Sequence, residues 1–309
     1  DYAGGGGWYK DSVTVSFTAN GDPALSDGSP GSGVNEATLS APQTFATDGS
    51  HTASGTVSDN AGNASSPGTL AVQVDATPPS LHIGCPSQAL FGATSATASV
   101  TASDGQSGLA QDPSGTVPID TSTVGPKVTT RTATDNVGHE TTASCTTQVV
   151  YSKVITASSA KALVVKAGEA VELASGAKVS ANVTVKAGGA LDIEGGTVSG
   201  TVVATGANAI RLCGARVTGA LTISSAIGPV AVGAVGCAGN MIYGKTTIKN
   251  NHGRVTASGN QFENSVVVKE NTNGVNVVGN QIAGALTVLG NTGAVVDRPN
   301  TVDGTSKIQ

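Results

Sequence analysis

The chain has 309 residues, of which 42 are glycine, only 12% are charged and only 3% are aromatic, and its formal net charge is −5. An average domain carries about 25% charged residues. Glycine follows no three-residue period, which excludes collagen, and no apolar run reaches the roughly 18 residues of a membrane helix. Scarce Leu, Met, Glu, Lys and Arg disfavour a helical bundle, and the mildly acidic balance disfavours nucleic acid. We expect an all-β protein of two or three domains.

The first residues, 1–7, are rich in glycine and contain no Met. Gly4–Gly7 follow no strand, so a phosphate-binding loop has no support there, and we expect a flexible tail. The start at Asp1 is typical of a mature or trimmed secreted protein. We therefore expect an extracellular or cell-surface location and no transmembrane segment.

Residues 8–78 show short alternating segments separated by turn residues. Val13–Phe17 and Thr69–Val74 alternate between apolar and polar side chains, which predicts strands. Val57–Asn63 contains Asp, Asn and Gly in the order of a tight hairpin turn. Asp75–Pro79 ends in Pro-Pro, which cannot enter a central strand, and is expected to be a stiff linker.

The next segment, 79–151, repeats this plan. Ala133–His139 matches the earlier turn, Val57–Asn63, in its order of Asp, Asn and Gly. The opening Gly7-Trp8-Tyr9, the turn Asp59-Asn60-Ala61-Gly62 and the linker Val74–Pro79 resemble bacterial immunoglobulin-like repeats of surface proteins. The resemblance implies two β-sandwiches, although the second copy lacks the Trp-Tyr opening.

Residues 152–309 have a shorter period. Asparagine recurs every 20 residues, and aligned apolar segments lie between the asparagines. A repeat of about 20 residues with short strands is typical of a parallel β-solenoid, for which we count about seven coils. Stacked coils are expected to bury their Val and Leu side chains. The recurring amides are expected to form a structural ladder, with ligand binding as the alternative. The ladder residues are Asn240, Asn260, Asn280 and Asn300.

The four cysteines allow three pairings, and a secreted context favours disulfides. Cys85 and Cys145 lie near the first and last strands of the second repeat, and Cys213 and Cys237 lie near one corner of consecutive coils. Pairing within each domain is therefore favoured. No Cys-x-x-Cys spacing indicates a zinc or redox site.

Asp192 and Glu194 lie two apart on one predicted strand and share a face. Such carboxylates can do acid–base work or bind a cation, but two solvated charges are the favoured interpretation. A second charged set is expected to form cross-coil ion pairs; it comprises Lys249, His252, Arg254, Glu263 and Glu270. No hydrolase, phosphate-loop or metalloprotease motif is present, so we do not expect an enzyme.

No cofactor is expected, with Ca²⁺ as the one alternative. Asp59, Asp75 and Asp104 lie in loops or the linker, where tandem extracellular sandwiches often hold Ca²⁺. No segment has the ligand density of a dedicated calcium loop. The four histidines share no metal-ligand spacing and are expected to be surface or turn residues; they are His51, His82, His139 and His252.

These features favour a secreted, non-catalytic bacterial cell-surface structural protein. The last coil, 300–309, is short and polar and is either a cap or a docking end. An exposed sheet edge would suit self-assembly into a filament or sheath, so the partners are further copies or other surface components. The alternatives are an adhesin or polysaccharide-binding module, or the accessory region of a larger carbohydrate-active enzyme. Sugar binding is disfavoured because the solenoid has few aromatic side chains, namely Tyr151, Tyr243 and Phe262.

Overall fold

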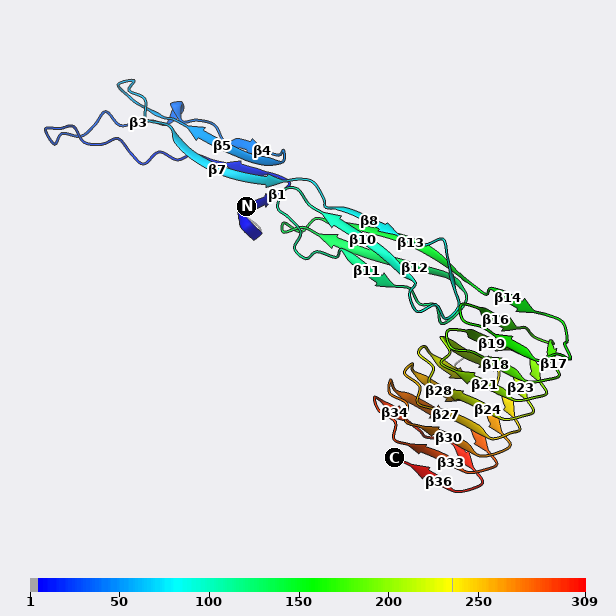
Figure 1. Cartoon of the computed structure of the whole chain (residues 1–309). Coiled ribbons are helices and arrows are strands. Elements are labelled where there is room, and N and C mark those ends of the chain that lie inside the picture. Colours follow the sequence, from blue (N-terminus) through cyan, green and yellow to red (C-terminus); the bar gives the residue numbers. More distant parts are fainter. Residues whose placement is uncertain (1–4, 235) are drawn as a thin grey trace. The chain divides into compact units, whose positions relative to one another are not determined.

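The computed structural model describes residues 5–234 and 236–309, and it confirms an all-β protein (Figure 1). The only helical elements in this part are two 3₁₀ turns, η1 (Gly5–Gly7) and η2 (Glu36–Thr38). The predicted tail, 1–7, falls partly outside the described residues. The chain forms two compact units. The first comprises 1–85, 98–117 and 129–145, and the second comprises 86–97, 118–128 and 146–309.

The first repeat forms small sheets in the first unit. The central sheet has the order β1-β7-β5, with β1 parallel to β7, and two further pairs are β2-β4 and β3-β6. Alternating Val and Ala side chains of these strands form a compact core. The strands are β1 (Trp8–Lys10), β2 (Val13–Val15), β3 (Val34–Asn35), β4 (Gln43–Phe45), β5 (Gly49–Gly55), β6 (Ser58–Asp59) and β7 (Gly68–Asp75).

The second repeat contributes two three-stranded sheets, with the orders β11-β10-β8 and β12-β13-β9. A disulfide joins Cys85 to Cys145, with 5.7 Å between the α-carbons, as the sequence predicts. The strands are β8 (Ser80–Gly84), β9 (Gln88–Leu90), β10 (Thr97–Ser103), β11 (Gly115–Pro118), β12 (Gly125–Thr134) and β13 (Glu140–Val150).

The two repeats share local contacts at equivalent positions. Asn60 donates its backbone N–H to the Gly33 carbonyl at 2.9 Å, and Asn136 donates to the Gly108 carbonyl at the same distance. In addition, β1 pairs parallel with β7 in the first repeat, and β9 pairs parallel with β13 in the second. The repeat in the sequence therefore corresponds to a repeat in local structure.

The second unit contains a parallel β-solenoid, as predicted, in which three sheets run along the stacked coils (Figure 1). The first sheet comprises β14 (Lys153–Ile155), β16 (Ala170–Leu173), β19 (Ala190–Glu194), β22 (Ala209–Cys213), β25 (Val230–Val232), β28 (Val255–Ser258), β31 (Val275–Val278) and β34 (Val295–Val296). The second comprises β15 (Leu163–Val165), β18 (Val183–Val185), β21 (Val202–Thr205), β24 (Leu221–Ser224), β27 (Thr246–Lys249), β30 (Val266–Lys269), β33 (Leu286–Leu289) and β36 (Ser306–Ile308). The third comprises β17 (Lys178–Val179), β20 (Thr197–Val198), β23 (Arg216–Val217), β26 (Met241–Ile242), β29 (Gln261–Phe262), β32 (Gln281–Ile282) and β35 (Thr301–Val302).

The two longer sheets have eight strands each, so the solenoid has about eight coils rather than the seven expected. The first coil, which contains β14 and β15, was missed because it lacks a full third strand. Only an isolated bridge between Ser159 and Val179 marks that corner. Because the strand of the third sheet is absent from the first coil, this coil does not show the full repeat pattern in the sequence.

Alternation along each strand places one face in the core. Val266 and Val268 of β30 are buried, and so are Leu286 and Val288 of β33, which pair with them in register. One continuous apolar cluster runs from Val165 to Val288. Because each coil covers its neighbours, the core grows with every added coil.

The corner that follows each long strand of the second sheet uses one left-handed residue. Ser225, Asn250 and Glu270 have φ values of 54°, 55° and 56°, and glycine stands at this corner in other coils, at 206 and 290. Left-handed backbone favours Gly or Asn. The corner conformation is therefore kept even where the residue type changes.

Candidate functional site

Charged side chains gather on the outer face of β16, β19 and β22. Glu172, Asp192 and Arg211 lie in register on these three neighbouring strands. The alternating Leu and Ile residues of the same strands point into the core, so the charged residues point outward. The sequence placed Asp192 and Glu194 on one face but did not identify Arg211, which lies one coil after Asp192.

The Arg211 guanidinium joins both carboxylates. Its Nη1 atom lies 2.8 Å from Asp192 Oδ2 and 2.5 Å from Glu194 Oε2. The Tyr151 hydroxyl donates a further hydrogen bond to Asp192 Oδ2 at 2.5 Å. Asp192 is only 1% exposed, so the expectation that it is a solvated charge is wrong; Glu194 is partly exposed. A buried carboxylate needs such partners because its transfer from water is costly.

Burial raises the pKa of Asp192, and the Tyr151 and Arg211 contacts offset this only in part. Burial, together with the nearby carboxylates of Asp192 and Glu194, raises the pKa of Glu172. Burial and the acceptor Asp192 also raise the pKa of the Tyr151 hydroxyl. Asp192 is thus held in fixed contacts with Arg211 and Tyr151, an arrangement that fastens Tyr151 to the sheet.

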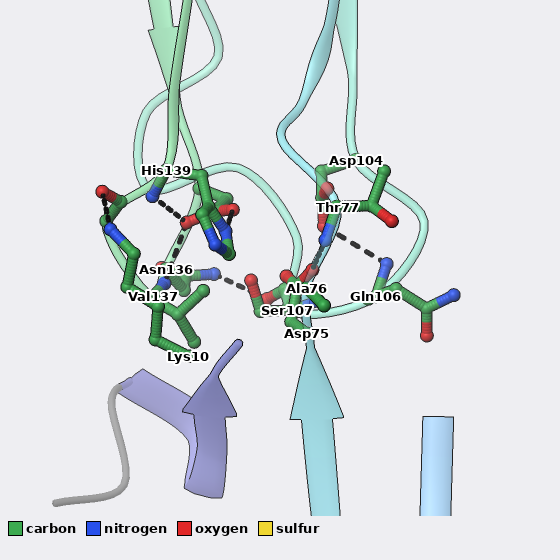
Figure 2. A network of polar contacts seen from close by, with 12 residues as sticks. Lys10, Asp75, Ala76, Thr77, Asp104, Gln106, Ser107, Asn136, Val137 and His139 are labelled. Atoms are coloured by element: carbon green, nitrogen blue, oxygen red, sulfur yellow. Dashed lines mark hydrogen bonds and ion pairs between the residues drawn. The ribbon is translucent and has the colours of Figure 1, made fainter. Parts of the chain in front are cut away.

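A second polar cluster lies in the first unit, where the end of β7 and the end of β1 meet two loops of the second repeat (Figure 2). Asp75, Asp135 and His139 are all buried, and one ligand-type atom from each lies within 4.8 Å of the others. Asp75 accepts backbone N–H groups from Thr77 and Ser107, both at 3.1 Å. The cluster therefore joins residues from both repeats.

His139 lies between two carboxylates. Its Nδ1 atom is 2.7 Å from Asp135 Oδ2, and its Nε2 atom is 2.8 Å from Asp11 Oδ1. Burial lowers the pKa of His139, but the contacts with Asp11 and Asp135 outweigh burial and raise it overall. Burial raises the pKa of Asp135, but the hydrogen bonds that it accepts from His139 outweigh burial and lower it overall. One of these bonds comes from the His139 backbone N–H at 2.8 Å. His139 is a turn residue as expected, but it is not a surface residue.

The calcium candidates lie in different surroundings. Asp59 closes its own turn by accepting from the Asn63 backbone and amide. Asp104 accepts the N–H groups of two residues in its loop, Gln106 and Gly108. Within 5–234 and 236–309, only Asp75 of the three belongs to a group of metal-ligand type, and its companions include an imidazole.

The structure brings the predicted asparagines into a buried ladder. The Nδ2 groups of Asn240, Asn260 and Asn280 each donate to Oδ1 of the asparagine in the next coil, at 2.8, 2.9 and 2.8 Å, and Asn300 is the last acceptor. Each amide also donates to a strand carbonyl, as in the 2.7 Å bond from Asn260 to Val232. These contacts join neighbouring coils and leave the amides engaged with one another.

A second ladder escaped the sequence analysis although it has the same spacing. Asn251, Asn271 and Asn291 join through Nδ2 to Oδ1 bonds of 2.8 Å each. Gln309 extends it, since its Oε1 accepts the Asn291 backbone N–H at 2.8 Å. The regular interval between asparagines was a sufficient signal for this ladder too.

The second predicted disulfide is present between Cys213 and Cys237, with 5.1 Å between their α-carbons.

The predicted cross-coil ion pairs are wrong. Lys249 lies in register with Lys269, and Glu270 pairs with Lys269 at 3.4 Å. In the described part of the chain, no salt bridge joins members of the set formed by Lys249, His252, Arg254, Glu263 and Glu270.

The three solenoid aromatics are occupied by protein contacts. Phe262 is buried in the core, and Tyr151 bonds Asp192. The Arg216 guanidinium covers the Tyr243 ring, 4.5 Å from the ring centroid. These contacts disfavour the stacking of a sugar on those rings.

Comparisons with known proteins provide no family for the chain. No family model matches the sequence. No curated protein is significantly similar to it. Among the described residues, no helix is long and apolar enough to cross a membrane.

Proposed function

We propose that this protein is a secreted, non-catalytic structural protein of a bacterial cell surface, and that its solenoid self-assembles into a filament or sheath. The two disulfides support an oxidising, extracellular environment. The immunoglobulin-like topology of the two repeats, 8–78 and 79–151, belongs to this proposal. It is supported by the repeated turn contacts and the resemblance of the turn and linker sequences to surface-protein repeats.

The observation that carries the proposal is the open edge of the first coil. In the described part of the chain, β14 pairs only with β16 and β15 pairs only with β18. Half-buried Ile155 and Leu163 line a hollow of about 450 Å³ at this end. The outward side chains of Val154 and Val164 are 48% and 45% exposed. An unpaired parallel edge with apolar lining can add a strand from another chain.

The outer face supports a structural role over catalysis. Asp192 and Glu194, for which acid–base work was the less favoured interpretation, share one guanidinium, and Asp192 is also bonded to Tyr151. Both Asn ladders join neighbouring coils through buried amides. This pattern is expected of a durable rod, in which most polar groups hold coils together.

A proline at the open edge tests the proposal. In β15, Leu163 donates its N–H to Asn182 and Val165 accepts from Lys186, so the N–H of Val164 faces away from β18. Val164→Pro would remove an edge donor without removing a bond of the solenoid. Sedimentation velocity of the full chain should show growth with concentration for the wild type. It should show one monomeric species for Val164→Pro.

Val164→Thr is the matched control, because it retains the edge N–H and suits a strand. It should assemble as the wild type does. A wild-type chain that stays monomeric at high concentration would contradict the proposal. So would a natively folded Val164→Pro variant, by far-UV circular dichroism, that assembles like the wild type.

A further inference from the structure

Asp75 and His139 come from different repeats and belong to one buried polar network (Figure 2). Asp135 belongs to the same group, and the more exposed Asp11 contacts His139. We propose that this cluster binds one divalent transition-metal ion, with Zn²⁺ as the representative ion. The ligands are a ring nitrogen of His139 and carboxylate oxygens of Asp75 and Asp135. This inference does not depend on the proposed self-assembly.

The charge balance of the cluster supports a cation. Three carboxylates, those of Asp11, Asp75 and Asp135, surround a single imidazole. Asp75 is 0% exposed, and among the described residues no cationic side chain forms an ion pair with it. The nearby ammonium of Lys10 donates to the Gly138 carbonyl at 2.7 Å. Buried charges are ordinarily paired or bound to a metal, because isolation in a dry site is costly.

A hydroxyl beside the cluster is also unsatisfied. Ser107 Oγ is buried and has no hydrogen-bond partner in the described part of the chain. The residue lies against the cluster, since its N–H donates to Asp75 Oδ2 at 3.1 Å. Buried polar atoms without partners are rare and call for an ion or its bound water. This observation is independent of the carboxylates.

The first repeat provides an internal comparison. In its turn, Asn63 occupies the position equivalent to His139, and Asp59 occupies that of Asp135. Asp59 accepts the Asn63 backbone N–H at 2.8 Å and its side-chain amide at 2.7 Å. The turn therefore closes without an imidazole. Histidine is present only in the copy where Asp75 and Asp11 approach the turn.

The ligand types select the metal. Imidazole nitrogen suits Zn²⁺ and related transition ions, whereas Ca²⁺ takes oxygen ligands almost throughout. His139 Nδ1 lies 2.7 Å from Asp135 Oδ2, so a metal bound to both atoms would replace the proton of this hydrogen bond, while Nε2 keeps its contact with Asp11 Oδ1 at 2.8 Å. A carboxylate that orients a ligating histidine through its other ring nitrogen, as Asp11 does here, is a common feature of zinc sites.

Isothermal titration calorimetry of the full chain, after EDTA treatment and dialysis, tests the proposal with ZnCl₂ and, in parallel, CaCl₂. We expect one Zn²⁺ per chain and weaker or no Ca²⁺ binding. His139→Asn should weaken Zn²⁺ binding by at least about tenfold. This variant is matched to the first repeat, where Asn63 closes the same turn. Cobalt absorption provides a second readout, since a bound Co²⁺ should lose its visible bands in the variant.

Two control variants, Asp59→Asn in the equivalent turn and His252→Asn in the solenoid, should bind Zn²⁺ as the wild type does. If His139→Asn loses its native circular dichroism, Asp75→Asn decides in its place, with the same expected loss of affinity. No Zn²⁺ binding by the wild type would overturn the proposal. Unchanged Zn²⁺ binding in a folded His139→Asn variant would also overturn it.

Discussion

Each buried asparagine of the solenoid serves as a donor and an acceptor at once. Asn260 Oδ1 accepts from Asn240, and its Nδ2 donates to the Val232 carbonyl and to Asn280. Removing one amide therefore leaves unsatisfied groups in two neighbouring coils. A buried polar group without a partner destabilises the fold by more than a typical hydrogen bond stabilises it, because water cannot reach the group to replace the lost partner.

Asn260→Ala should lower the free energy of unfolding by about 2 to 4 kcal/mol. Denaturant unfolding followed by far-UV circular dichroism measures this change. The matched control is Asn264→Ala in the same coil, since Asn264 is exposed and its side chain bonds only the next backbone N–H. The control should change stability by less than about 0.5 kcal/mol. Equal effects of the two substitutions would contradict the ladder's structural role.

Asp192 provides a pH test. Its pKa in the folded chain is raised, chiefly by burial, so the folded state holds more protons than the unfolded state above about pH 4. Stability should therefore fall as pH rises from that value through the raised pKa. Glu172, whose pKa is also raised by burial, acts in the same direction.

Asp192→Asn should remove its share of this dependence. The slope of unfolding free energy against pH should be less negative in the variant than in the wild type, as measured by denaturant unfolding at several pH values. Asn264→Ala, an exposed substitution that changes no titratable group, should leave the wild-type slope unchanged. A steeper negative slope in Asp192→Asn would contradict the assigned direction.

At the scale of elements, the coil period was predictable because every coil buries the same positions. Alternation and the regular spacing of asparagine identified the solenoid, its core valines and one ladder. The first coil was missed since its third corner is a single bridge rather than a strand. The repeat period of the sequence therefore predicts the stacked coils well, but it does not predict where the stack begins.

The charged contacts were harder to predict. Arg211 lies one coil after Asp192 and bonds it, whereas Lys249 lies in register with Lys269, a residue of the same charge. The spacing of charged residues in the sequence does not distinguish these two cases. His139 meets Asp11 across 128 positions of sequence. A contact over this separation cannot be predicted from a local sequence pattern. The turn was predictable from its repeat, whereas its partners depend on how the repeats pack.

The solenoid disulfide should stabilise its own element. Cys213 and Cys237 are 24 residues apart, and closing such a loop in the unfolded chain is worth about 3 kcal/mol. The double substitution Cys213→Ala/Cys237→Ala should lower unfolding free energy by that amount. Hydrogen exchange with mass spectrometry should locate the loss of protection in the solenoid coils around β22.

The other disulfide provides the comparison. Cys85→Ala/Cys145→Ala opens a separation of 60 residues and should cost about 4 kcal/mol. Its loss of protection should be confined to the first unit, in β8 and in residues 140–145 of β13. Equal loss of protection in the first unit and in the solenoid, for either double variant, would contradict the expectation that each disulfide stabilises only its own part of the chain.

At the scale of the whole molecule, the solenoid combines a continuous core, two ladders of buried amides and an open edge at its first coil. The eight coils at about 4.8 Å each give a solenoid roughly 38 Å long. A rod of this length becomes a long structure only by adding further copies. The proposed filament therefore depends on self-assembly through the first coil.

Negative-stain electron microscopy of the purified full chain, in physiological salt, tests this claim most directly. We expect long fibres with a regular axial repeat for the wild type and for Val164→Thr. We expect separate short particles for Val164→Pro. Separate particles in the wild-type sample at high concentration would contradict the claim, and a glycan array would then test the adhesin alternative.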